Sequence, residues 1–200
     1  MTQILLICIV GALLELDTTY AFQFTLSRGI IAGPLLSLIT GDLMTGLQIG
    51  IFTELIFIDI SPLGGLLPPS GAVCCTLTLA LCSVGLPPYF AFFFGVIGAV
   101  LFSVCEVLVR KSRSGWLMRQ EPLILQRPPY LSFVVVKALG ISFIMTLAYL
   151  LFYSTVMGSS LARLLPFIPE KLHLASKFAY MAVPWIGLAT LVSTFRLKTR

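Results

Sequence analysis

Residues 86–105 read LPPYFAFFFGVIGAVLFSVC, and this stretch decides the fold class. It contains 20 residues without a charged side chain, and a helix of roughly 20 apolar residues crosses the hydrocarbon core of a bilayer. Residues 138–157 and, slightly shorter, residues 178–195 have the same uncharged character. The sequence therefore predicts an all-α, polytopic helical membrane protein.

The overall composition excludes several other classes. Of the 200 residues, 58% are hydrophobic and 10% are charged, whereas soluble globular domains carry about 25% charged and 45–50% apolar residues. Such a chain is neither disordered nor collagen-like. Its 13 Lys and Arg residues are too few for a surface that follows nucleic-acid phosphates. The five cysteines lie in apolar stretches without metal-ligand spacing, so we expect core thiols rather than disulfides.

The charges divide the chain into three regions. Residues 1–109 contain six acids and one base, Arg28, whereas residues 110–200 contain twelve bases and two acids. The densest basic run lies in residues 110–129, which we expect to form a cytoplasmic loop under the positive-inside rule. The C-terminal tail is also basic and follows two crossings later, which places it on the same side. Residues 130–200 are thus predicted to form a transmembrane hairpin.

The N-terminal region contains four apolar segments that are too short to cross a bilayer unaided. Each holds about 11–13 residues, a length typical of buried or re-entrant segments, and polar or Gly/Pro-rich runs separate them; they are residues 4–14, 30–40, 47–58 and 72–84. Residues 29–109 contain no Lys or Arg, so no basic loop fixes their orientation. The side of the N-terminus and the number of full crossings before Leu86 stay open.

Three acids of this region stand out because ionisable groups inside a membrane face a cavity or a partner. Gly46, Gly50 and Glu54 recur every four residues and share one face of a helix, so Glu54 points at a packed interface or a substrate cavity. A simpler alternative is that a neighbouring helix provides the hydrogen-bond partners of the Glu54 carboxylate. Asp42 precedes a helical pattern, which equally suits an N-cap, and Asp59 lies near the end of that pattern.

Residues 68–71, Pro-Pro-Ser-Gly, predict a break in a membrane segment. Broken segments expose backbone groups that can bind a polar solute at mid-membrane depth. Packing alone is another reason for Gly and Pro in membrane helices.

Motifs for catalysis are scarce. The sole histidine, His173, lies in the polar 158–177 connection, where a structural role is expected rather than pairing with a serine nucleophile. No P-loop, metal-ligand cluster or haem pair is present in the sequence. The basic run 110–113 and Trp116 suit an anionic lipid, a soluble partner or a simple topology anchor.

One string of residues has a specific likeness. Ser27-Arg28-Gly29, the Gly-Asp-x-x-Thr-Gly turn at 41–46, Glu54 and the Pro-Leu-Gly-Gly run at 62–65 before a Pro pair occur in order. This string resembles the N-terminal half of the IIC subunit of the mannose/fructose/sorbose family of bacterial phosphotransferase systems. The likeness covers about a quarter of the chain; beyond Leu86 it is one of hydropathy only.

The resemblance implies a multi-pass permease subunit in the bacterial cytoplasmic membrane. Such a subunit pairs with a IID membrane subunit, forms the path for a hexose-type sugar and works with soluble IIA and IIB proteins. It needs no cofactor or metal and is not an enzyme by itself, since IIB carries the phosphate. Polar side chains that would bind sugar hydroxyls are Glu54, Asp42, Asp59, Gln48, Arg28 and Ser70.

Two departures from the family pattern keep other functions open. Gly29 replaces a proline, and Ser70 stands where an acid often follows the Pro pair. The C-terminal half is also shorter than is usual. One alternative is a non-transporting membrane scaffold that recruits soluble phosphotransferase proteins through its basic loop. Another is a secondary transporter driven by protons on Glu54 or Asp59.

Overall fold

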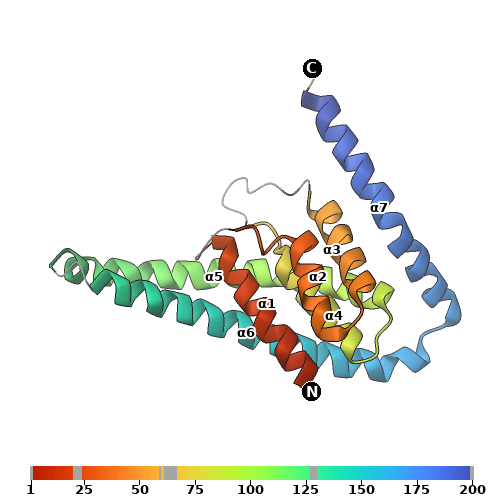
Figure 1. The fold of residues 1–200 in the computed structure, drawn as a ribbon, viewed down its shortest axis with the longest axis horizontal. Helices are drawn as coiled ribbons and strands as arrows, with labels where there is room; N and C mark the ends of the chain where they lie inside the picture. Colours follow the sequence, from red (N-terminus) through yellow and green to blue (C-terminus); the bar gives the residue numbers. More distant parts are fainter. Residues whose placement is uncertain (1, 20–23, 59, 61–66, 127–129, 199–200) are drawn as a thin grey trace.

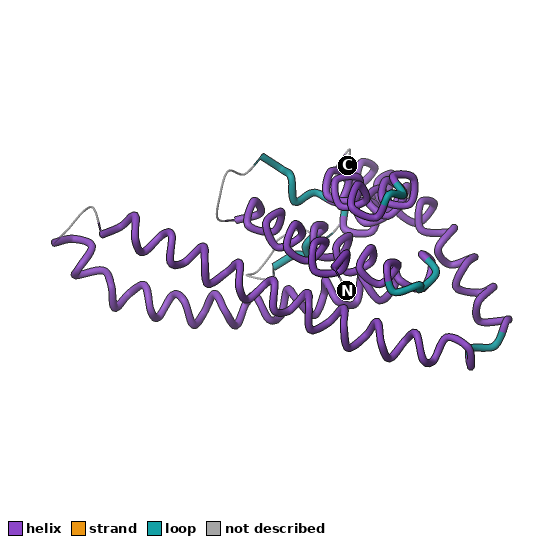
Figure 2. The backbone as a smooth tube through the Cα atoms, turned by 60° about the horizontal axis from the view of Figure 1, so that its bottom comes forward, coloured by secondary structure: helices purple, strands orange, loops and turns teal. Residues whose placement is uncertain are grey.

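The structure, a computed structural model, describes residues 2–19, 24–58, 60, 67–126 and 130–198. In these ranges the chain consists of helices and loops (Figure 2), which confirms the predicted all-α class. The helices are α1 (Thr2–Thr19), α2 (Gly29–Thr40), α3 (Leu43–Phe57), α4 (Gly71–Ser83), α5 (Pro88–Gln126), α6 (Tyr130–Leu164), the short 3-10 helix η1 (Leu165–Phe167) and α7 (Glu170–Lys198).

Within the described residues, three helices are long and apolar enough to cross a membrane, and they contain residues 88–105, 138–157 and 178–195 of the predicted spans. Their apolar portions are Pro88–Glu121, Tyr130–Phe167 and Glu170–Ser193. Helices α5 and α6 form a long antiparallel hairpin, and α1 to α4 pack near its middle (Figure 1). Helix α7 diverges from this body toward the C-terminus (Figure 1).

The four short apolar segments form α1 to α4, as predicted. Helices α2, α3 and α4 have 12, 15 and 13 residues, fewer than the roughly 20 that a span requires. Helix α4 is the most enclosed, because its residues 72–81 are all buried. It packs against α1, α2, α3, α5 and α6. Protein rather than lipid therefore surrounds this short apolar helix.

Glycines bring α2 and α3 into backbone contact. A Cβ atom added to Gly33 would lie 2.3 Å from the carbonyl oxygen of Gly46, and one added to Gly50 would lie 2.4 Å from that of Gly29. The predicted packed face through Gly46, Gly50 and Glu54 is thus confirmed. Between the helices, Gly41 has a φ of +81°, a left-handed conformation that glycine adopts without strain.

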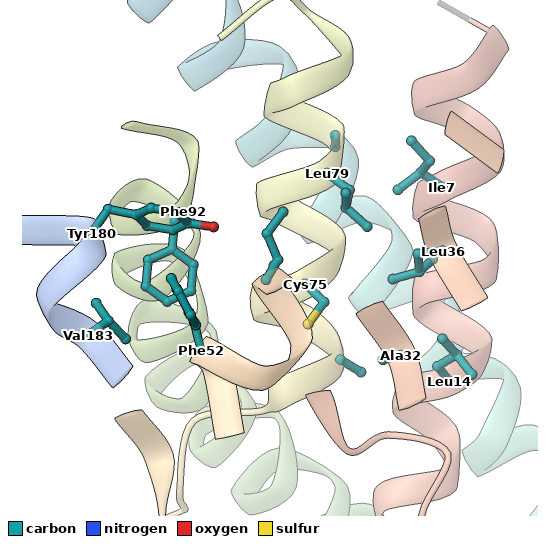
Figure 3. Close-up of a cluster of buried hydrophobic side chains, with 13 residues drawn as sticks. Ile7, Leu14, Ala32, Leu36, Phe52, Cys75, Leu79, Phe92, Tyr180 and Val183 are labelled. Atoms are coloured by element: carbon teal, nitrogen blue, oxygen red, sulfur yellow. The ribbon is translucent and has the colours of Figure 1, made fainter. Parts of the chain in front are cut away.

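An aromatic cluster connects α7 to the rest of the molecule. Phe52 of α3, Phe92 of α5 and Tyr180 of α7 converge with Val183 in one buried group (Figure 3). The ring centroids of Phe52 and Tyr180 are 4.8 Å apart. Gly187 lets α7 approach Leu55 of α3. These contacts hold the middle of α7 against α3, the helix that carries Glu54.

The segment expected to be a basic loop is helical through Gln126. Residues 110–126 continue α5 without interruption, and α6 begins at Tyr130. Most residues of this segment are strong helix formers, namely Arg, Lys, Leu, Met, Gln and Glu. The helix therefore continues through the basic residues. Likewise, α6 extends to Leu164 and α7 begins at Glu170, which leaves a shorter connection than the 158–177 loop that the sequence predicted.

Candidate functional site

A cavity of about 330 Å³ with both polar and apolar walls lies where α2 and α4 begin and α3 ends. Its polar walls include Ser27, Arg28, Glu54 and Ser70, and the Pro pair 68–69 forms part of its rim. The extended residues before α4 provide this rim, because proline cannot supply the N–H groups that would continue a helix. The cavity thus forms at the predicted break in the membrane segments.

Arg28 and Glu54 form an ion pair in this cavity. The Arg28 Nη2 atom lies 3.0 Å from the Glu54 Oε2 atom, and the two side chains are 65% and 25% exposed. Arg28 occupies the position before the first turn of α2, where its side chain makes no capping bond, and Glu54 lies in the last turn of α3. A guanidinium and a carboxylate side by side offer several hydrogen-bond donors and acceptors, a combination that suits a polyol.

Ser70 forms another polar wall, and α1 holds it in place. Its side chain accepts a bond from the backbone N–H of Val73 at 3.4 Å, so it is the N-cap of α4. Its hydroxyl donates to the Glu15 Oε2 atom. Glu15 is only 5% exposed. The sequence left Glu15 out of the candidate site, and the structure places it directly behind Ser70.

Asp17, two residues further along α1, orders the segment that leads into Arg28. Its carboxylate accepts the backbone N–H groups of Phe24 and Leu26 at 2.8 and 2.7 Å. The backbone N–H of Arg28 in turn donates to the Thr25 carbonyl at 3.0 Å. Asp17 is 5% exposed. The signal for both missed acids was their position at the end of an apolar segment, where an ionised group requires an internal partner.

Two other predicted residues, Asp42 and Gln48, do not join this cavity. Asp42 is the N-cap of α3, twelve residues before Glu54 and thus about 18 Å away along the helix. It accepts the Thr45 N–H at 3.1 Å and the Thr45 hydroxyl at 2.5 Å, and these bonds lower the pKa of Asp42. Gln48 is exposed on α3 and does not line the cavity. Asp59 lies outside the described residues.

A second cavity, of about 320 Å³, lies between the end of α1 and the α5–α6 hairpin. Glu15 lines it and so stands between this cavity and the one that contains Ser70. Its other carboxylate is Glu106, which pairs with Arg110 at 2.6 Å. The other walls are mainly apolar and include Phe102 and Phe152.

His173 and the cysteines occupy structural positions. The His173 Nδ1 atom lies 3.2 Å from the Tyr89 hydroxyl, and the imidazole meets the Phe90 ring edge-on at a centroid distance of 5.0 Å. All five cysteines are free thiols; Cys8, Cys74 and Cys75 are buried as expected, whereas Cys82 is half-buried and Cys105 is exposed. Among the described residues, no three His, Cys, Asp or Glu side chains come together as a metal site.

Comparison with known proteins identifies the family. The chain matches the family described as "PTS system sorbose-specific iic component" over residues 1–199. A solved structure titled "Structure of membrane protein" is similar, with a TM-score of 0.78 and 20% identity over 98% of this chain and 80% of that one. Its identity is low enough that this likeness concerns the fold alone. The search of curated proteins found no match.

The family match is wider than the likeness that the sequence showed. That likeness covered residues 27–72, with only hydropathy in common beyond Leu86, whereas the match continues through α5, α6 and α7. A IIC component is a membrane subunit of a sugar-phosphorylating transport system. The chain therefore belongs to the sorbose-type family of IIC components of the phosphotransferase system.

Proposed function

We propose that this chain forms the sugar translocation path of a phosphoenolpyruvate-dependent system together with a IID-type membrane subunit. In this proposal the cavity between α2, α3 and α4 binds a hexose-type sugar. The observation that carries it is the Arg28–Glu54 ion pair, which is partly enclosed in a cavity of about 330 Å³. Small-molecule sites have volumes of roughly 300–1,000 Å³, so this cavity suits a single small solute.

The chemistry of the two charged groups fits binding better than catalysis. Sugar hydroxyls would donate to the Glu54 carboxylate and accept from the Arg28 guanidinium, and the ion pair supplies both in one place. Phosphoryl transfer would be the task of soluble IIA and IIB proteins. The membrane subunit then binds, orients and releases the sugar without forming a covalent bond to it.

The basic residues near the α5–α6 turn suggest an orientation. We place this turn and the C-terminal end of α7 on the cytoplasmic side of the bacterial cytoplasmic membrane, because cytoplasmic loops carry an excess of Lys and Arg. The soluble proteins would then approach the membrane from the side of the α5–α6 turn.

Uptake of labelled hexose tests the proposal in cells that also express the neighbouring IID, IIA and IIB subunits. Glu54→Gln should reduce uptake about tenfold to a hundredfold, since hydrogen bonds to charged groups contribute about 1.5–3 kcal/mol. Asp42→Asn is the matched control, because Asp42 lies at the other end of α3 and should leave uptake unchanged. Wild-type uptake in Glu54→Gln would remove this residue from the site.

The scaffold alternative predicts that the chain binds soluble phosphotransferase proteins but transports no sugar. Lys111 and Arg119 are exposed on α5, where they are accessible to a soluble protein. A chain that retains IIB-type proteins in a pull-down, yet moves no sugar with every subunit present, would support a scaffold. Uptake that collapses with the proton gradient but persists without phosphoenolpyruvate would instead indicate a secondary transporter.

A further inference from the structure

A groove of about 440 Å³ runs along one face of the α5–α6 hairpin. Its apolar walls are Leu108 and Val109 of α5 and Ile141 and Met145 of α6. Leu108, Ile141 and Met145 are 63%, 38% and 49% exposed, so the groove opens to the surroundings of the chain. It lies outside the cavity that contains Arg28 and Glu54.

Cations gather at one end of this groove. Arg113 and Trp116 line that end, and the Arg113 guanidinium donates to the Ser142 hydroxyl at 2.6 Å. The Lys137 ammonium lies 5.1 Å from the centre of the Trp116 ring. Residues 107–120 contain four bases and no acid, and residues 130–145 contain Lys137 and no acid. This end of the groove therefore attracts anions.

The other end of the groove is apolar and continues inward. Val109 and Met145 also line the second cavity, of about 320 Å³, which reaches Phe102 and Phe152. From Trp116 to Phe102 the α5 helix rises about 21 Å. The two adjoining cavities thus form one elongated surface with a cationic end and a mainly apolar end, whose two carboxylates are Glu15, bound to Ser70, and Glu106, paired with Arg110.

The cationic end lies at a suitable depth for lipid headgroups. Arg110 follows Pro88 by 22 residues, a helical rise of about 33 Å, close to the thickness of the hydrocarbon core. A span that enters the membrane at Pro88 therefore leaves it near Arg110. Trp116 lies just beyond, and tryptophan is enriched at membrane interfaces.

We propose that this groove is a binding site for an anionic phospholipid. The phosphate would contact Lys137, Arg113 and the Ser112 hydroxyl, and an acyl chain would lie along Val109 and Met145. A phospholipid has a charged headgroup at one end and apolar acyl chains at the other, and the groove has cations and apolar walls in the same order. An acidic soluble protein would complement the cations but would leave the apolar end unfilled.

Native mass spectrometry of the purified full chain tests this site. The detergent-solubilised protein is mixed with equal amounts of phosphatidylglycerol and phosphatidylethanolamine that carry identical acyl chains. We expect preferential retention of phosphatidylglycerol, and Lys137→Gln should reduce that preference about fivefold through the loss of one cation. Lys177→Gln, which removes the same charge from an exposed position on α7, should leave it unchanged.

A second variant tests the apolar end without altering any charge. Ile141→Trp fills the groove, so it should reduce retention of both lipids while circular dichroism shows unchanged helix content. Equal retention of the two lipids by the wild type would overturn the proposal, as would equal losses in the Lys137 and Lys177 variants. Retention of an acidic soluble protein, lost in Lys137→Gln and without lipid preference, would assign the surface to a protein partner instead.

Discussion

The α1–α4 region and the α5–α6 hairpin are both helical and apolar, but they are held together differently. Glycines bring α2 and α3 together until backbone meets backbone, and buried carboxylates of α1 complete the polar contacts. In the hairpin, side chains such as Arg113 and Tyr149 bridge the helices instead, and a Cβ atom added to Gly115 or Gly140 would meet no atom within 4 Å. Alanine should therefore be tolerated at Gly115 and Gly140 but not at the glycines between α2 and α3.

The largest effect is expected where the backbones touch. Gly33→Ala places a Cβ atom 2.3 Å from the Gly46 carbonyl oxygen, which cannot move aside as a side chain can. Overpacking of this kind costs about 1–3 kcal/mol or more. We expect a clear drop in the thermal unfolding midpoint of the detergent-solubilised protein.

Gly140→Ala in α6 is the matched control, because open space surrounds that position. Alanine is favoured over glycine within a helix by up to about 1 kcal/mol, so this variant should be neutral or more stable. Equal destabilisation by the two substitutions would contradict the proposed difference between the regions.

The next effect concerns Glu15, the buried carboxylate behind Ser70, and it depends on the proposed transport function. Glu15→Ala removes the acceptor of the Ser70 hydroxyl, so we expect a roughly tenfold increase in the KM for sugar uptake. Ser70→Ala should have a similar effect, and the double variant should be no worse than either, because both remove one interaction. Glu15→Asp should restore part of the loss.

Glu106→Gln provides the comparison in the hairpin. Glu106 lines the same second cavity as Glu15, but its partner is Arg110 rather than Ser70. The KM for uptake should stay at the wild-type value. If the wild type transports sugar and Glu15→Ala has the same KM, Glu15 has only a structural role.

The smallest effects involve single tyrosine hydroxyls. Tyr149 of α6 donates to the Gly98 carbonyl of α5 at 2.6 Å, so Tyr149→Phe should reduce stability by about 1 kcal/mol. The Tyr180 hydroxyl is buried and has no hydrogen-bond partner among the described residues. Tyr180→Phe should therefore be neutral or slightly stabilising, and thermal unfolding of both variants checks this difference.

The sequence predicted what short-range patterns determine. Runs of apolar residues indicated the helices, and the spacing of Gly46, Gly50 and Glu54 predicted a packed face, which the structure confirms. The alternative of an N-cap at Asp42 is also confirmed. These features depend on residues three or four positions apart, so the sequence alone contains them.

Features that depend on distant contacts were missed. Glu15 meets Ser70 across 55 residues of sequence, and no local pattern indicates that pair. Positive charge suggested a loop at 110–129, whereas helix propensity and contacts such as Arg113 with Ser142 favour a continuous helix through Gln126. The family match over residues 1–199 shows that the likeness beyond Leu86 was also underestimated.

The backbone contact between α2 and α3 limits how the cavity can open. With Gly33 and Gly46 in contact, neither helix can slide or rotate past the other without a collision. In the proposed transport cycle, α2 and α3 should therefore move as one rigid body. Spin labels on Leu38 and Leu47 should keep a constant separation when sugar is added, and a change in that separation would contradict a rigid α2–α3 pair.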